Sequence, residues 1–192
     1  MLREFLAEYL RLPAETFSPR QDARDPVAVW ERSTSNSLMF YAVNRERFPA
    51  TIAVELSPGA KVVRLSDNSA AALSAGQLRV TLEPYQLLAF RADAGSRITG
   101  LTTTVSPENR DRVSRQVHWM VELVQEQGKQ WVGGLDADDK ALLERTAKEA
   151  TSALAAGHLW RTRTMLEDHR LLAIYRQLKR FPPELRDASS QD

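Results

Sequence analysis

The spacing of hydrophobic residues changes once along the chain, near residue 106. Before this point, apolar and polar residues alternate in short runs, which is typical of β-strands with one buried face. After it, apolar residues recur every three or four positions, which is typical of amphipathic helices. The sequence therefore predicts an α+β protein, in which an antiparallel β-sandwich is followed by an antiparallel three-helix segment.

The alternating region predicts a sandwich of about seven short strands. In the segment TIAVELS (51–57) alternation is strict, so Ile52, Val54 and Leu56 should face the core. The segment LMFYAVN (38–44) is apolar on both faces, which predicts a central strand that is covered on both sides. No helical pattern separates the strands, so a parallel sheet is not expected. The expected strands are 27–32, 38–44, 51–57, 61–67, 77–82, 85–92 and 97–105.

Three helices are expected after the sandwich. Ser106-Pro107-Glu108 is typical of a helix start, and Gly128 should end this first helix. Asp136 should cap a second helix that ends at Gly157. A third helix is expected from Leu159 to Lys179 and should end before Pro182-Pro183.

These elements divide the chain into four parts. A short helix and an extended connector occupy residues 1–25, the sandwich 26–105, the helices 106–182, and a disordered tail 183–192. The first helix is too short to be stable alone, so its apolar face must pack on another surface. This surface is either the sandwich or a partner domain. The apolar face comprises Leu2, Phe5, Leu6, Tyr9 and Leu10.

Composition excludes several classes of function. The chain has 192 residues, no cysteine and a formal net charge of +1. The lack of cysteine rules out disulfides, thiolate metal sites and thiol catalysis. Lys and Arg number 12 against 11 acids in residues 1–105 and 14 against 14 in residues 106–192, so no basic tract predicts a nucleic-acid or membrane partner. No apolar stretch is long enough to span a membrane, and Arg3 and Glu4 make the N-terminus unlike a signal peptide, which leaves the compartment undetermined.

No arrangement of reactive side chains predicts catalysis. No two of His118, His158 and His169 have the spacing of a helical metal-binding pair, so no metal site is expected. The sequence has no Gly-x-Ser-x-Gly turn and no phosphate-binding loop, so we expect neither catalytic residues nor a cofactor. The acids at 136–139 are explained by the start of a helix, where negative charge is favourable.

Two tryptophans are candidates for contact with a ligand. Exposed aromatic rings can stack on the faces of sugar rings. Trp131 lies beside Gly133-Gly134 in a connecting segment, where exposure is expected, and Trp30 lies on a strand, where it is either core or interface. Trp119 and Trp160 lie in helices and are expected to pack.

Several sequence segments resemble a region that follows the catalytic barrel in some large bacterial glycoside-hydrolase-like proteins. The stretch 3–30 is similar to the helix that leads from the barrel into an accessory sandwich, and 38–56 is similar to the opening strands of that sandwich. The stretch 78–91 is similar to its closing strands, and 153–171 to a helical tail. The matching residues are Glu4, Phe5, Tyr9, Arg11, Leu12, Pro13, Ala14 and Phe17, then Tyr41, Val43, Asn44, Pro49, Val54 and Leu56, and then Leu82, Pro84, Tyr85, Leu87 and Phe90.

This resemblance implies a non-catalytic C-terminal accessory region of a larger carbohydrate-active enzyme, and hence an upstream catalytic barrel as its partner. The barrel and its catalytic carboxylates are absent from this sequence, so no catalytic residue is carried over. If the parent protein is exported, its signal lies upstream of Met1. Two alternatives stay open: a free-standing carbohydrate-binding module that uses Trp131 or Trp30, and a helical scaffold that binds a protein through an exposed apolar patch on 159–178.

Overall fold

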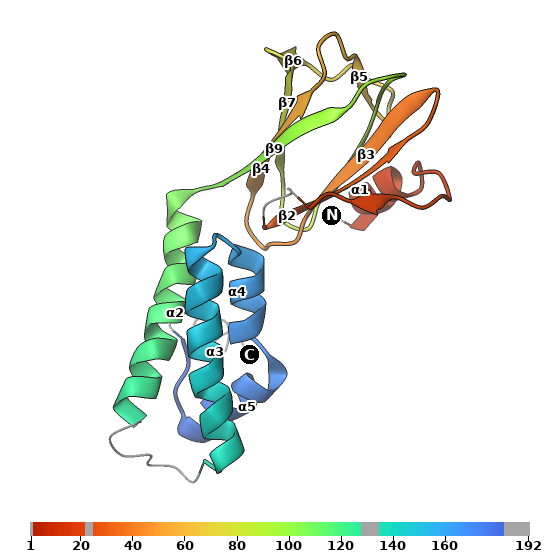
Figure 1. Ribbon diagram of the computed structural model, residues 1–192. Coiled ribbons are helices and arrows are strands. Elements are labelled where there is room, and N and C mark those ends of the chain that lie inside the picture. Colours follow the sequence, from red (N-terminus) through yellow and green to blue (C-terminus); the bar gives the residue numbers. More distant parts are fainter. Residues whose placement is uncertain (1, 22–24, 128–134, 183–192) are drawn as a thin grey trace. The chain divides into compact units, whose positions relative to one another are not determined.

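The computed structural model describes residues 2–21, 25–127 and 135–182, and it divides the chain into two compact units, Met1–Ser106 and Pro107–Asp192 (Figure 1). In the described residues, the strands and one helix lie in the first unit, and the other helices lie in the second. The α+β class predicted from the sequence is confirmed. No helix in the described part of the chain is both long and apolar enough to cross a membrane.

The first unit is built from two antiparallel sheets that face each other. A five-stranded sheet has the order β1-β2-β3-β8-β5, and a four-stranded sheet has the order β6-β7-β4-β9. The alternating pattern works as expected, because Ile52, Val54 and Leu56 of β4 are buried between the sheets. The strands are β1 (Ser18–Pro19), β2 (Val27–Ser33), β3 (Ser37–Asn44), β4 (Ala50–Leu56), β5 (Val62–Arg64), β6 (Leu73–Ser74), β7 (Gln77–Leu82), β8 (Leu87–Asp93) and β9 (Ile98–Val105).

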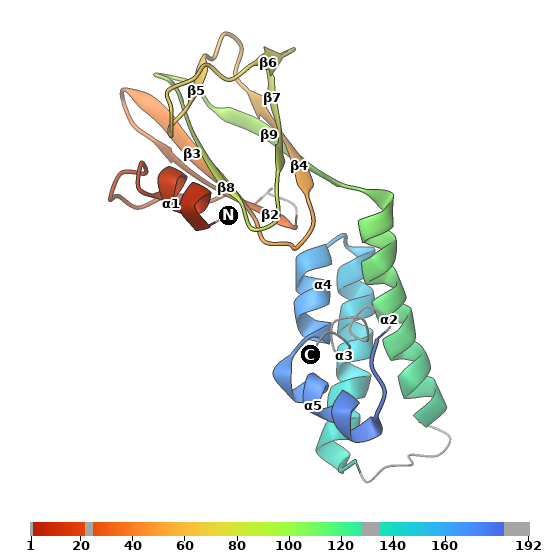
Figure 2. The same cartoon turned by 180° about the vertical axis from the view of Figure 1, so that it is seen from behind.

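Helix α1 (Leu2–Tyr9) lies against the outer face of the five-stranded sheet, beside β8 (Figures 1 and 2). The connector that follows α1 is joined to the same sheet, because β1 pairs with β2 and aligns Pro19 with Trp30. Arg20 adds an ion pair to Glu31 of β2 with an N–O distance of 3.0 Å. The helix and the connector are therefore parts of the first unit.

Among its described residues, the second unit has four helices around one apolar core. They are α2 (Pro107–Gln127), α3 (Ala137–Ala155), α4 (Leu159–Leu166) and α5 (His169–Leu178). Asp136 caps α3 as expected, since its carboxylate accepts a hydrogen bond of 2.8 Å from the backbone N–H of Asp139. The core includes Met120, Leu143, Leu166, Leu171 and Tyr175.

The single helix expected from Leu159 to Lys179 is in fact two helices, α4 and α5. Apolar residues recur at helical spacing through the whole stretch, but the helix is interrupted at Asp168, which caps α5. Its carboxylate accepts a hydrogen bond of 2.9 Å from the backbone N–H of Arg170. The large apolar side chains of this stretch are buried or half-buried, so its described residues do not form the exposed patch that a helical scaffold would need.

Tyr175 is the largest side chain that is fully buried in this core. Its hydroxyl donates a hydrogen bond of 3.1 Å to the backbone carbonyl of Leu166, and its ring packs edge-on against Trp119 with 5.2 Å between centroids. Burial raises the pKa of the Tyr175 phenol above its ordinary value, and the neighbouring carboxylates of Asp168 and Glu167 raise it further. The hydroxyl therefore stays protonated in the folded state when an unfolded tyrosine would ionise.

We expect Tyr175→Phe to reduce the loss of stability that the protein undergoes between neutral and alkaline pH. The folded pKa is raised, so Tyr175 contributes stability that is complete below about pH 10 and falls as the pH rises through the folded pKa. At pH 8, loss of one hydrogen bond should lower the free energy of unfolding by about 1 kcal/mol. Urea unfolding followed by circular dichroism at pH 8 and pH 11 measures both effects. An equal fall in stability between these pH values for wild type and variant would contradict the expectation. Tyr85→Phe, at an exposed tyrosine, is the control.

Candidate functional site

The candidate site lies on α1 and the connector that follows it, and the buried side of α1 is anchored by a carboxylate. Glu8 is only 1% exposed. Its Oε1 accepts a hydrogen bond of 2.5 Å from Nε of Arg64 on β5, and its Oε2 accepts a longer one of 3.4 Å from the backbone N–H of Ala89 on β8. A buried carboxylate is costly unless it is paired and hydrogen-bonded in this way. Glu8 thus determines which side of α1 faces the sheet.

The opposite side of α1 carries apolar side chains into solvent. Leu6, Tyr9 and Leu10 are 41%, 55% and 74% exposed. The ring of Tyr9 stacks on that of Phe5 one turn earlier, with 6.1 Å between centroids. The helix therefore buries an acid against its own sheet and exposes large apolar residues, which reverses the usual arrangement of an amphipathic surface helix.

A groove, which we call the α1 groove, continues from this exposed side along the connector. Its volume is about 440 Å³. The connector is held over the sheet by an ion pair between Glu15 and Arg32 of β2. The groove is lined by Tyr9, Leu10, Leu12, Pro13, Ala14, Glu15, Thr16 and Phe17.

Phe17 links the α1 groove to an aromatic cluster on the outer face of the sheet. Its ring packs edge-on against Tyr41 with 5.2 Å between centroids, and Tyr41 stacks on Trp30 of the neighbouring strand with 5.1 Å between centroids and 11° between ring planes. Burial raises the pKa of Tyr41, and the nearby Tyr9 raises it further. The pairing of β2 with β3 places Trp30 opposite Tyr41.

Of the two tryptophans selected from the sequence, Trp30 belongs to this cluster and Trp131 lies outside the described residues. One face of the Trp30 indole is occupied by Tyr41, so packing is part of the role of this residue. Its contact with a ligand stays a prediction. Within the described part of the chain, no three or more His, Cys, Asp or Glu side chains form a group that could hold a metal ion.

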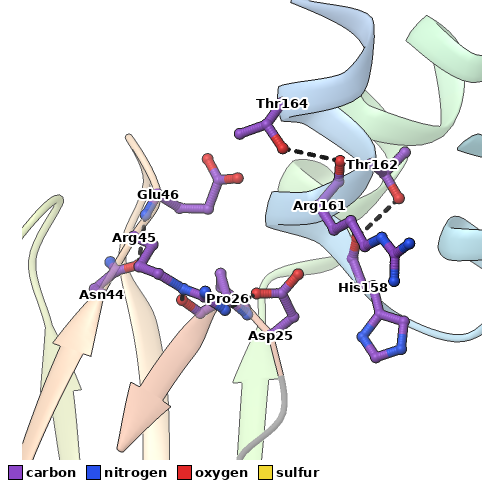
Figure 3. Close-up of polar contacts among 9 residues, drawn as sticks. All are labelled: Asp25, Pro26, Asn44, Arg45, Glu46, His158, Arg161, Thr162 and Thr164. Carbon is purple, nitrogen blue, oxygen red and sulfur yellow. Dashed lines mark hydrogen bonds and ion pairs between the residues drawn. The ribbon is translucent and has the colours of Figure 1, made fainter.

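Asn44, one of the residues that carry the family resemblance, organises the turn at the end of β3. Its side-chain amide donates hydrogen bonds to the backbone carbonyls of Phe48, Leu82 and Glu83 at 2.8, 3.2 and 3.1 Å. Its Oδ1 accepts one of 3.0 Å from the backbone N–H of Glu46, as Figure 3 shows. The side chain of Asn44 is fully buried, so its role in this structure is to join β3 to the turns that follow β3 and β7.

An ion pair lies beside this turn. Arg45 binds the carboxylate of Asp25, and its Nε donates a hydrogen bond to the backbone carbonyl of Pro26 (Figure 3). The pair ties the residue that follows β3 to the residues that precede β2. These contacts stabilise one end of the five-stranded sheet.

The sequence did not point to Glu8 or to the α1 groove. An acid beside apolar residues normally indicates the solvent side of a helix, and the partner of Glu8 is 56 residues away. The apolar residues of this segment were expected to pack either on the sandwich or on a partner domain, and the exposure of Leu6, Tyr9 and Leu10 shows that these three do not pack on the sandwich. The only local signal is the run of apolar residues that continues past the end of the helix.

Comparison with known proteins gives partial matches to glycoside hydrolases. No family model matches the chain, and no curated protein matches it. An α-amylase from Anoxybacillus matches at a TM-score of 0.35 and 14% identity, over 41% of this chain and 18% of its own. A family GH27 β-L-arabinopyranosidase from Geobacillus stearothermophilus matches at 0.34 and 18% identity, over 41% and 20%.

A family 30 subfamily 8 glycoside hydrolase, a xylanase from Clostridium acetobutylicum, matches at a TM-score of 0.34 and 16% identity, over 45% of this chain and 26% of its own. The matched regions thus span between about a fifth and a quarter of these enzymes. The likeness concerns less than half of this chain and assigns no activity to it.

Proposed function

We propose that this chain is a non-catalytic accessory region of a larger carbohydrate-active enzyme, related to glycoside hydrolases, and that the exposed side of α1 packs against the catalytic barrel of that enzyme. The carrying observation is the reversed arrangement of α1. Leu6 of α1 and Leu10, the residue that follows α1, are 41% and 74% exposed while Glu8 is 1% exposed, although a free-standing domain would normally bury these leucines.

The chemistry of the α1 groove supports a protein surface as its occupant. Its walls are mostly apolar or uncharged, and its charged side chain, Glu15, is paired with Arg32. Burial of Leu6, Tyr9 and Leu10 against a second surface would gain about 2 kcal/mol for each large side chain that is fully removed from water. The resemblance of residues 3–30 to the segment that follows a catalytic barrel agrees with this occupant.

In this role the region contributes stability and positioning to the enzyme, while bond cleavage belongs to the barrel. The aromatic cluster lies next to the contact surface, since Phe17 belongs both to the α1 groove and to the cluster. We propose that Trp30 and Tyr41 hold the connector in the shape that the barrel contacts. Trp30 and Trp131 are also the residues with which the region would extend a sugar-binding cleft.

The first test is the mass of the protein that the gene produces in cells. In cells that carry the gene, an antibody raised against this chain should detect a protein that is several hundred residues longer than this chain. Its mass should therefore be well above 21.7 kDa. A cellular protein of 21.7 kDa would overturn the proposal of a covalently attached barrel.

The second test uses Leu10→Lys. In the isolated chain the substitution should change the free energy of unfolding by less than about 0.5 kcal/mol, because Leu10 is largely exposed. In the complete protein it should lower stability by about 2 kcal/mol, because a lysine would be buried at the contact. Tyr85→Lys is the matched control, since Tyr85 is an exposed aromatic residue outside α1. Equal effects of the two substitutions in the complete protein would contradict the proposed contact.

A further inference from the structure

A second concave surface, distinct from the α1 groove, lies within the helical unit. It is a cleft of about 480 Å³ between one face of α3 and the beginning of α4. This volume lies in the range of sites that bind small molecules. The residues that line the cleft from α3 follow the helical spacing i, i+3, i+4, i+7, i+8 and i+11, so they form one continuous face: Arg145, Lys148, Glu149, Ser152, Ala153 and Ala156.

Positive charge is concentrated in this cleft. Arg145 and Lys148 come from α3 and Arg161 from α4, against one acid, Glu149. Residues 106–192 have balanced charge in total, so the excess is local. Neither Arg145 nor Lys148 forms an ion pair with any residue that the structure describes. Their charged groups are therefore available to a ligand.

The first turn of α4 is held in place by its own side chains. Thr162 donates a hydrogen bond of 2.8 Å from Oγ1 to the carbonyl of His158, and Thr164 donates one of 3.0 Å to the carbonyl of Arg161 (Figure 3). His158 precedes α4 at the capping position, but its imidazole makes no capping hydrogen bond. The imidazole is half-buried and lines the cleft. The carbonyls that accept these two hydrogen bonds belong to His158 and Arg161, the residues that line the cleft from the start of α4.

The composition of the cleft indicates the kind of ligand. Guanidinium and ammonium groups bind carboxylate and sulfate oxygens through short charge-assisted hydrogen bonds. Glu149 and Ser152 supply acceptors for hydroxyl groups, and Ala153 and Ala156 offer a small apolar floor. The residues that line the cleft include no Phe, Tyr or Trp, and the imidazole of His158 is the aromatic ring among them.

From these features we infer that the cleft on α3 and α4 binds an oligosaccharide that carries carboxylate or sulfate groups. The choice of a saccharide rests on the proposed function, whereas the preference for a negative charge rests on Arg145 and Lys148 alone. The cleft would hold an acidic part of the polymer on which the enzyme acts. Neutral sugars of the same length would bind far more weakly, because they cannot pair with the two cations.

Isothermal titration calorimetry of the full chain tests this inference. The probes are a galacturonic acid tetramer, a sulfated heparin-derived tetrasaccharide, a neutral galactose tetramer and sodium sulfate. We expect at least one acidic tetramer to bind, and the neutral tetramer to bind at least about tenfold more weakly than that acidic tetramer. Raising the salt concentration from about 0.05 to 0.5 M should weaken the binding, because the paired groups are exposed.

The variant for this test is Arg145→Gln/Lys148→Gln, which removes two exposed charges without removing buried atoms. It should lower the affinity for the acidic tetramer at least about tenfold while its circular dichroism stays unchanged. The matched control is Arg110→Gln/Arg176→Gln, which removes two exposed charges from α2 and α5, outside the cleft. The control should bind like the wild type.

Three outcomes would overturn the inference. Equal loss of affinity in the variant and the control would mean general attraction to a charged surface. Sodium sulfate that binds as tightly as the acidic tetramers would mean an anion site without preference for a saccharide. Absence of binding to both acidic tetramers would remove the site altogether. None of these outcomes bears on the contact made by α1, which is tested separately with Leu10→Lys.

Discussion

Asn44→Asp should destabilise the sandwich by about 3 kcal/mol or more, which is the largest effect that we expect from a single substitution. The amide of Asn44 is fully buried, and its two N–H groups serve three backbone carbonyls, so one of the hydrogens is shared between two acceptors. A carboxylate at this position has no hydrogen to donate when ionised, and its negative charge would face three carbonyl oxygens. Each buried acceptor that loses its donor costs about 1–3 kcal/mol, and the desolvated charge adds to this cost.

Hydrogen exchange measured by mass spectrometry can follow this change in the first unit alone. Peptides from β3, β4 and β7 should lose protection in Asn44→Asp and Asn44→Ala, whereas peptides from α2 and α3 should not. Asn36→Ala is the matched control, because Asn36 is exposed in the turn before β3. Unchanged protection of β3 and β4 in Asn44→Asp would show that the turn does not depend on these hydrogen bonds.

The second large effect is expected from Arg64→Met, which removes the positive partner of Glu8. The Glu8 carboxylate would stay buried with only the long hydrogen bond from Ala89, and an unpaired buried charge is strongly unfavourable. Arg64 is 37% exposed, so water already weakens the pair. We therefore expect a loss of about 2 kcal/mol, which appears as release of α1 from the sheet rather than as unfolding of the whole unit.

A double-mutant cycle separates the pair from other effects of the substitution. Glu8→Gln/Arg64→Met should be more stable than Arg64→Met, because a neutral amide at position 8 no longer needs a cation and its oxygen can still accept from Ala89. Protection of the α1 amides against hydrogen exchange is the measurement. Arg79→Met, at an exposed arginine on β7, should leave this protection unchanged. An additive cycle, with no coupling between positions 8 and 64, would show that the ion pair does not hold α1.

The parts of the fold that the sequence predicted well are those with a local period. The alternation in β4 identified Ile52, Val54 and Leu56 as core residues, and all three are at most 6% exposed. Asp136 identified the start of α3, because helix capping depends on residues only three positions apart. Such signals are contained within one turn or one strand.

The features of the fold that the sequence did not predict depend on contacts between distant residues, or arise where two local signals conflict. The break between α4 and α5 was hidden because the apolar spacing of a helix continues through it, although the cap formed by Asp168 was readable in the sequence. The stacking of Trp30 on Tyr41 follows from the pairing register of β2 and β3. Gln116 of α2 has the spacing of a core residue and is 1% exposed, with no hydrogen-bond partner for its amide among the described residues.

The candidate site was predictable only in outline. The apolar run in residues 2–10 indicated a surface that needs a partner, which the exposure of Leu6, Tyr9 and Leu10 agrees with. The side of the helix that faces the sheet was not predictable, because it depends on the pairing of Glu8 with Arg64. The basic cleft was hidden by the balanced total charge of the second half of the chain, since charge counts carry no information about which helix faces meet.

The anchoring of α1 by Glu8 has a practical consequence for dissecting the gene. An expression clone that starts at the first long strand, near residue 26, would omit both α1 and β1. Such a product would leave the backbone N–H of Ala89 without its carboxylate acceptor and would uncover the outer face of the sheet around Tyr41. Soluble expression of the sandwich therefore requires cloning boundaries that retain the residues before position 26. The parent clone of any deletion series should include these residues.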